Sequence, residues 1–233
     1  MFWVVVHSVP VWKRSFLQGQ QGRRKIELHI PEGFLNIQTV VITQVTAAGS
    51  LLPALRRVNA RLSSERVPLL GLAAAFLFTV QIFSFPVPGG TSVHISGVVL
   101  VAFLLGSLSA YILTAAALFL HLFLFQHGGI SSFGANLMNI GLLPCLFVYL
   151  AKGILPAKNR FLWVAGLAWL AKLGSAFLCA VQLHFSGFIE LKSGAVAMTI
   201  SHFFGGAVEA VVTLSFLNLI QKIRPELLEI NKV

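Results

Sequence analysis

The chain has 233 residues, of which 57% are hydrophobic and only 10% are charged. Its mean hydropathy of +0.86 leaves too little polar surface to coat a soluble globule, so lipid must solvate most of the chain. The net charge of +10 is spread in short basic clusters between apolar runs, with no basic helix or aromatic-interleaved patch. This pattern argues against nucleic acid as a partner.

A helix needs roughly 20 mainly apolar residues to cross the hydrocarbon of a membrane. The segment from His94 to Gln126 is too long for one span, and the small residues that begin at Gly106 predict a turn inside it. The predicted spans are about 36–55, 67–85, two within 94–126, 134–151, 160–184 and 195–220. The sequence therefore predicts an all-α, polytopic membrane bundle of about seven transmembrane helices.

The distribution of Lys and Arg predicts the orientation of these spans, because short cytoplasmic loops carry an excess of both residues. If the first span enters from outside, the outer loops after residue 29 contain only Lys192. The basic residues on the cytoplasmic side are then Arg56, Arg57, Arg61, Arg66, Lys152, Lys158, Arg160, Lys222, Arg224 and Lys232. We expect a multi-pass protein of the inner (plasma) membrane, with His29, His94 and His127 on its external face.

Neutral imidazole is a common metal ligand, and these three histidines each lie in a distinctive motif. The motifs are His29-Ile30-Pro31-Glu32-Gly33-Phe34-Leu35, Pro86-Val87-Pro88-Gly89-Gly90-Thr91-Ser92-Val93-His94 and His127-Gly128-Gly129-Ile130-Ser131-Ser132-Phe133-Gly134-Ala135-Asn136. In this order they resemble the three signature loops of the CbiM/NikM family. Members of that family are the substrate-capture components of energy-coupling-factor (ECF) transporters for cobalt and nickel. The resemblance covers the chain from about residue 28 to its end.

The resemblance implies a compact bundle that holds one divalent metal, Ni²⁺ or Co²⁺, near the external face. In such proteins the chain begins Met-His. The terminal amine, the backbone nitrogen and imidazole of that His, and a second His after the Gly-Thr-Ser loop bind the metal. Carried over to this sequence, the two imidazoles are those of His29 and His94, and an all-nitrogen tetragonal set suits nickel or low-spin cobalt.

Further residues of the expected pocket and its loops are Leu28, Gly90, Thr91, Ser92 and Asn136. Glycine tolerates the backbone angles that a loop needs when it bends closely over an ion. His127 stands where the family commonly has an acidic or polar residue. We expect it to be an external collector of metal or a surface residue more than a ligand.

Residues 1–28 depart from the family pattern, because they precede His29 and carry basic residues on the predicted external side. We expect residues 1–28 to be an N-terminal extension from a mis-assigned start and residues 29–233 to be a single transmembrane metal-capture domain. Translation from Leu28, read as Met, would restore Met-His at the terminus. The alternative is that the extension is real and that the protein binds metal differently or not at all.

Ionisable groups inside a membrane are costly, so they indicate a functional or structural pairing. Lys172 lies in the sixth predicted span and Glu209 in the seventh. We expect these two side chains to form an ion pair that locks the two helices together. His121, in the fourth span, and His184, at the end of the sixth, are expected to be packing or interfacial residues.

The sequence contains neither a Gly-x-x-x-x-Gly-Lys-Ser/Thr phosphate loop nor a His-Glu-x-x-His metalloprotease motif. We therefore expect a transporter subunit, not an enzyme. By resemblance, its partners would be a transmembrane coupling (T) protein and a pair of cytoplasmic ATPases, with a small auxiliary membrane subunit as a further candidate. Capture of the ion would be followed by ATP-driven reorientation of the subunit.

The sequence leaves two other functions open. A membrane-embedded metalloenzyme could use the three external histidines, with Glu32 as the only obvious general base. A stand-alone secondary carrier would usually contain inverted repeats or broken helices, which are not apparent in this sequence.

Overall fold

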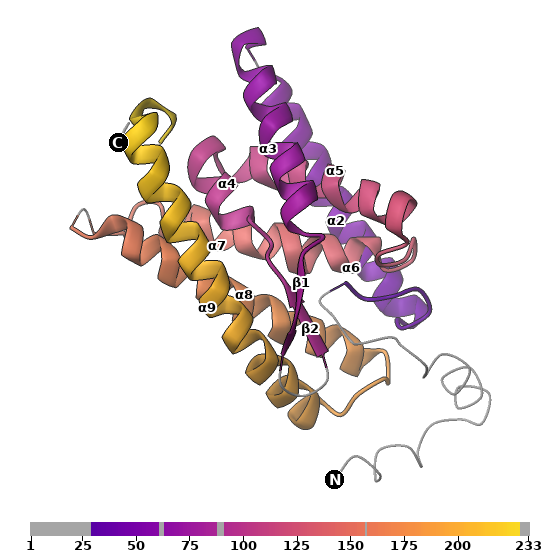
Figure 1. Cartoon of the computed structure of the whole chain (residues 1–233). Coiled ribbons are helices and arrows are strands. Elements are labelled where there is room, and N and C mark those ends of the chain that lie inside the picture. Colours follow the sequence, from indigo (N-terminus) through magenta and orange to yellow (C-terminus); the bar gives the residue numbers. More distant parts are fainter. Residues whose placement is uncertain (1–28, 61–62, 88–90, 157, 229–233) are drawn as a thin grey trace.

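The computed structural model describes residues 29–60, 63–87, 91–156 and 158–228, which form a bundle of helices (Figure 1). Five helical segments are long and apolar enough to cross a membrane. They are α2 (Ile37–Asn59), α5 (Ser107–Phe125), the continuous run of α6 (Phe133–Leu137), a π-helical turn (Met138–Leu142) and α7 (Leu143–Ala151), then α8 (Arg160–Phe185) and α9 (Leu191–Ile223). The prediction of an all-α membrane bundle is confirmed.

The ends of α2 illustrate how the local sequence sets the helix limits. The side chain of Asn36 precedes the helix and accepts a hydrogen bond from the backbone nitrogen of Thr39 at 2.8 Å, which satisfies one free amide of the first turn. Arg56 and Arg57 lie in the last turn, where positive charge is favourable to the helix dipole. This helix therefore begins and ends close to the predicted span.

The second and third predicted spans differ from the structure. Helix α3 (Val67–Val80) ends earlier than expected and is followed by an antiparallel hairpin of β1 (Ser84–Val87) and β2 (Thr91–His94). Helix α4 (Val98–Leu105) has only 8 residues, which is too short to cross a membrane. The third predicted span is thus not a complete membrane-crossing helix.

Helix α4 is apolar because it lies inside the protein, not because it faces lipid. All residues from Val98 to Phe103 are buried. A glycine lies at each end of α4. Gly97 has a φ of +68° and Gly106 a φ of +87°, and other residues rarely adopt these conformations. The turn expected near Gly106 is the break between α4 and α5.

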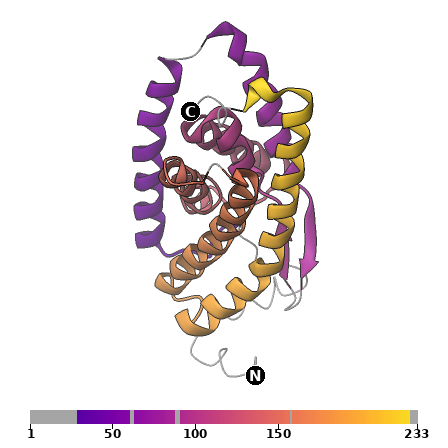
Figure 2. The same ribbon diagram turned by 90° about the vertical axis from the view of Figure 1, so that its left-hand side faces the viewer.

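The helices form two groups around the short elements. Helices α8 and α9 pack mainly against each other, and both strands of the hairpin contact α9. Helix α2 packs against α5 and α6, and it lies on the opposite side of the bundle from α9 (Figure 2). The hairpin that ends in His94 therefore lies on the same side of the bundle as α9.

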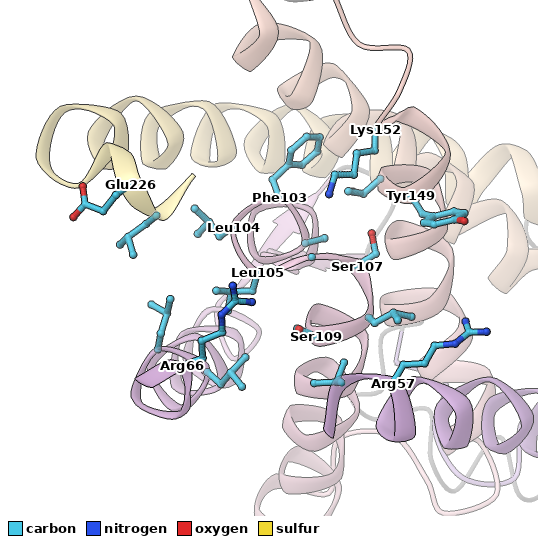
Figure 3. A pocket seen from close by; sticks show the side chains of 18 of the residues that line it. Arg57, Arg66, Phe103, Leu104, Leu105, Ser107, Ser109, Tyr149, Lys152 and Glu226 are labelled. Atoms are coloured by element: carbon cyan, nitrogen blue, oxygen red, sulfur yellow. The ribbon is translucent and has the colours of Figure 1, made fainter. Parts of the chain in front are cut away.

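A cavity of about 720 Å³ lies at the end of the bundle where α5 begins (Figure 3). Its lining includes the basic side chains of Arg57, Arg66, Lys152 and Arg160, and none of its described lining residues is a histidine. Helix α5 leads from this cavity at Ser107 to the histidine-containing loop after Phe125. The cavity is therefore distinct from the candidate metal site at the other end.

Candidate metal centre

Four histidine side chains gather at the end of the bundle opposite this cavity. The ring centroid of His29 lies 4.5 Å from that of His94, 5.7 Å from that of His127 and 6.2 Å from that of His121. The three histidines expected on the external face are thus brought together. The fourth, His121, projects from α5 into this group, whereas the sequence indicated only a packing role. We refer to these four residues as the histidine cluster.

Each member of the histidine cluster has one buried ring nitrogen without a hydrogen-bond partner among the described residues. These atoms are Nε2 of His29, Nε2 of His94, Nδ1 of His121 and Nδ1 of His127. His29, His94 and His121 are all buried, and His127 is partly exposed. Unpaired buried polar atoms are costly and uncommon, so a concentration of them indicates a binding function.

The electrostatic surroundings keep the two central imidazoles neutral. Burial, followed by the nearby His127, His121 and Lys172, lowers the pKa of His29 to about 3. Burial is also the main reason why the pKa of His94 lies well below its usual value, and Lys172 is the next cause. Neutral imidazole retains the lone pair that a transition metal requires.

His29 is held in place by the α6 side of the bundle. The backbone nitrogen of Ile30 donates a hydrogen bond to Oδ1 of Asn136 at 2.7 Å, and Nδ2 of Asn136 donates to the Ile30 carbonyl at 3.1 Å. The same carbonyl accepts a bond from Oγ of Ser132 at 2.6 Å. Asn136, expected to shape the pocket, therefore fixes the backbone next to His29.

The loop after α5 approaches the His29 segment closely. An added Cβ at Gly129 would lie only 2.2 Å from Oε2 of Glu32, so this position needs glycine. The Glu32 carboxylate accepts a hydrogen bond from the backbone nitrogen of Ser131 at 3.1 Å. Glu32, considered above as a general base, thus joins the two loops.

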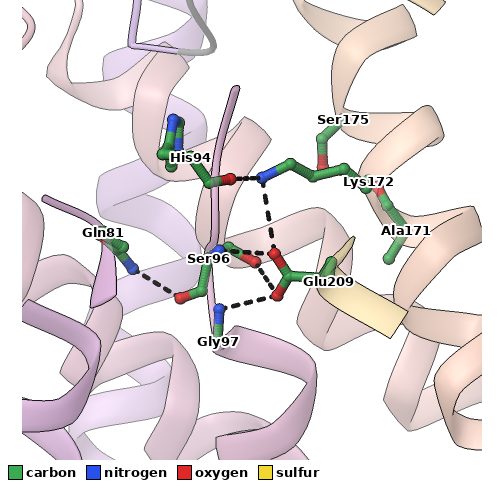
Figure 4. A network of polar contacts seen from close by, with 8 residues as sticks. All are labelled: Gln81, His94, Ser96, Gly97, Ala171, Lys172, Ser175 and Glu209. Carbon is green, nitrogen blue, oxygen red and sulfur yellow. Dashed lines mark hydrogen bonds and ion pairs between the residues drawn. The ribbon is translucent and has the colours of Figure 1, made fainter. Parts of the chain in front are cut away.

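His94 is held by α8 and α9 through buried ionic groups (Figure 4). Nζ of Lys172 donates a hydrogen bond to the His94 carbonyl at 2.5 Å and lies 3.7 Å from Oε2 of Glu209. The Glu209 carboxylate accepts bonds from the backbone nitrogens of Ser96 and Gly97 and from Oγ of Ser96, at 2.7 to 2.8 Å. The expected pair of Lys172 and Glu209 therefore lies next to the His94 loop, a connection that the sequence did not indicate.

Close packing also fixes the residue before His94. An added Cβ at Gly205 of α9 would lie 2.1 Å from Cγ1 of Val93, which is buried. Helix α9 thus contacts the Val93 side chain before His94 and the backbone of Ser96 and Gly97 after it.

Four further residues were expected in the pocket and its loops. Leu28 and Gly90 lie outside the described residues, and Thr91 and Ser92 belong to β2 without described side chains. Within the described ranges, no three His, Cys, Asp or Glu side chains form a group arranged to hold one ion. A complete ligand set at His29 and His94 would therefore need further donors, such as backbone or terminal nitrogens.

The fold and these residues define a multi-pass membrane protein with a cluster of histidine side chains at one end. The family described as "Cobalt uptake substrate-specific transmembrane region", CbiM, matches residues 29–227. The chain belongs to the CbiM family.

Individual relatives agree with this assignment. The chain is 32% identical over 221 residues to the fused nickel transport protein NikMN of Rhodobacter capsulatus, covering 86% of this chain and 64% of that protein. It is 28% identical to the cobalt transport protein CbiM of Clostridium tetani, covering 76% of this chain and 73% of the relative. The chain thus spans less than two thirds of the fused nickel protein.

Solved structures are similar as well. A crystal structure described as a transition metal transporter aligns with a TM-score of 0.77 and 30% identity, covering 84% of this chain and 93% of the other. A truncated transition metal transporter gives the same TM-score at 29% identity and covers 83% of this chain and 98% of the other. At these levels of identity and coverage, the similarity extends over nearly the whole described bundle.

Proposed function

We propose that this chain is the membrane subunit that captures Ni²⁺ or Co²⁺ for uptake, with His29 and His94 as its imidazole ligands. The observation that carries the proposal is the pair of buried rings 4.5 Å apart in a member of the CbiM family, each with an Nε2 that has no hydrogen-bond partner among the described residues. Relatives named for nickel or cobalt transport support this substrate class.

The ligand chemistry follows from what the two histidines can provide. Their imidazoles supply two nitrogen donors, and the backbone nitrogen of His29 and an N-terminal amine next to it would complete a tetragonal set. Asn136 and Ser132 would orient the His29 segment, while Lys172 and Glu209 would orient the His94 loop. Each ligand is thus positioned by a separate set of hydrogen bonds, as is common at metal sites.

Orientation and partners belong to the same proposal. The excess of Lys and Arg on alternate loops supports placing the histidine cluster on the external side of the plasma membrane. Energy would come from a transmembrane coupling protein and a cytoplasmic ATPase pair, with a small auxiliary membrane subunit as a further candidate partner. Co-purification from cells that express these subunits together, and ATP-dependent metal uptake by the assembly, would test this part.

The first experiment measures metal content and affinity of the purified protein by mass spectrometry and calorimetry. We expect one tightly bound Ni²⁺ or Co²⁺ per chain and loss of tight binding in His94→Ala. His184→Ala is the matched control, because its side chain is exposed and lies outside the histidine cluster. Tight binding that survives His94→Ala would contradict the assignment of this ligand.

The role of a terminal amine needs a second comparison. One form would start at Met1 and the other with Met in place of Leu28, directly before His29. Tight binding by the shorter form alone supports the amine as a ligand and Leu28 as the start. Equal binding by both forms means that the amine is not a ligand, and binding by neither removes nickel and cobalt as substrates.

A further inference from the structure

His121 and His127 form a second pair of imidazoles within the histidine cluster, next to His29. Their ring centroids are 6.3 Å apart, and each has a buried Nδ1 without a hydrogen-bond partner among the described residues. His29 is the common neighbour of this pair and of His94. The pair is not needed for the proposed ligand set, so its unpaired nitrogens call for a separate explanation.

The hydrogen bonding of His121 identifies the atom that can bind a cation. Nε2 of His121 lies 2.9 Å from the carbonyl oxygen of Phe78. A carbonyl oxygen can only accept a hydrogen bond, so Nε2 carries the hydrogen and Nδ1 carries the free lone pair. Metal-bound histidines usually donate their other ring nitrogen to an acceptor in this way, which fixes the orientation of the ring.

The end of α5 brings His127 back over His121. Gln126 adopts a left-handed conformation with a φ of +54°, and the backbone nitrogen of His127 donates a hydrogen bond to the His121 carbonyl at 3.3 Å. This turn places a partly exposed ring, that of His127, beside a fully buried one. The pair therefore extends from the surface towards His29.

We infer that His121 and His127 form an accessory position for the transported ion, which receives it from outside and passes it to His29 and His94. The inference rests on the proposed function, since it assumes that His29 and His94 are the main ligands. Two imidazoles that bind one ion at about 2.0 to 2.1 Å from opposite sides have ring centroids about 6.5 Å apart. The separation of 6.3 Å therefore fits an ion held between two nearly opposite nitrogens.

The chemistry of the pair predicts which ions it accepts and how firmly. Imidazole nitrogen favours divalent late transition metals over Mg²⁺ or Ca²⁺, which prefer oxygen ligands. Among the described residues, no third protein ligand completes the set. An ion there would keep water ligands and exchange readily, which suits a position of transit.

The test uses, in detergent, the form of the chain that binds metal tightly in the comparison of start sites above. It is titrated with Co²⁺, and stopped-flow measurements follow loading through the visible absorption of bound Co²⁺. In the variant His121→Gln/His127→Asn, we expect tight binding of the first ion to persist and a weaker second equivalent to be lost. The rate of loading at low Co²⁺ should fall about tenfold. This is the lower end of the 10- to 100-fold losses in affinity or activity that follow mutation of residues next to metal ligands. His184→Gln serves as the control.

Two results would overturn the inference. If the double variant loads as fast as the parent and keeps any second equivalent, the pair has no part in capture. If the double variant loses the tight ion, while His127→Asn alone folds and also loses it, the pair belongs to the main ligand set. A parent protein that binds neither Co²⁺ nor Ni²⁺ refutes the proposed function instead, so the two failures are distinguishable.

Discussion

The two halves of the candidate metal centre are held by different chemistry. On the His29 side, Asn136 and Ser132 form neutral hydrogen bonds to one residue, Ile30. On the His94 side, a buried ammonium and a buried carboxylate bind the backbone at and just after His94. Because neutral and ionic groups respond differently to truncation, the two sides of the centre can be perturbed separately.

The largest effect is expected from Glu209→Gln, which removes a charge and keeps the shape of the side chain. It leaves the ammonium of Lys172 buried without a counter-ion, and both side chains are almost fully buried. We expect the free energy of unfolding to fall by about 3 to 5 kcal/mol. Thermal unfolding in detergent measures the loss.

A double-variant comparison separates the ion pair from other effects of this substitution. In Lys172→Met/Glu209→Gln, no charge remains unpaired, so much of the stability should return. If Glu209→Gln unfolds at the temperature of the parent and transports normally, the ionic side of the comparison is wrong.

The neutral side should respond more weakly to Asn136→Ala. This change removes both side-chain bonds to Ile30 and leaves its buried backbone nitrogen unpaired, at a cost of about 1 to 3 kcal/mol. Because Ile30 follows His29 directly, metal affinity should also fall by about 10- to 100-fold. Calorimetry measures the affinity, and Asn218→Ala, an exposed position on α9, is the control.

Packing near His94 can be disturbed without touching any charge. In Gly205→Ala the added methyl collides with Val93, which we expect to destabilise the protein by about 1 to 3 kcal/mol. The double variant Val93→Ala/Gly205→Ala should recover part of the loss in a thermal unfolding assay. Gly49→Ala is the matched control, because nothing lies within 4 Å of an added Cβ there.

The smallest effects are expected when one hydroxyl group is removed on each side of the candidate metal centre. Ser96→Ala removes a bond to the Glu209 carboxylate, and Ser132→Ala removes a bond to the Ile30 carbonyl. Hydrogen bonds to charged groups are the stronger kind, so Ser96→Ala should cost about 2 kcal/mol and Ser132→Ala about 1 kcal/mol. Equal losses in unfolding free energy would remove the distinction between the two sides.

The sequence predicts the membrane class and most of the long helices because apolar length is a direct physical requirement of a span. The sequence fails to predict α4, since this helix of eight apolar residues, six of them buried, has the same composition as part of a lipid-facing helix. The β hairpin was also missed, because the Pro- and Gly-rich run that starts at Pro86 indicates a loop as readily as a turn between strands.

The candidate centre was predictable only in part. The motifs around His29 and His94 indicated which histidines to consider, and the ion pair was expected from two charges in adjacent spans. The membership of His121 was not foreseen, because it depends on tertiary packing of α5 against Phe78 and on the left-handed turn at Gln126 that brings His127 next to it. Its only sequence signal was the cost of an imidazole inside an apolar helix.

The length of α9 has a mechanical consequence. At about 1.5 Å per residue, its 33 residues extend for about 50 Å, some 20 Å more than the hydrocarbon of a membrane. The helix must therefore overhang the lipid or cross it with a strong tilt. Glu209 belongs to this helix, so any movement of α9 relative to the bundle would also move the carboxylate that accepts hydrogen bonds from the backbone of Ser96 and Gly97, beside His94.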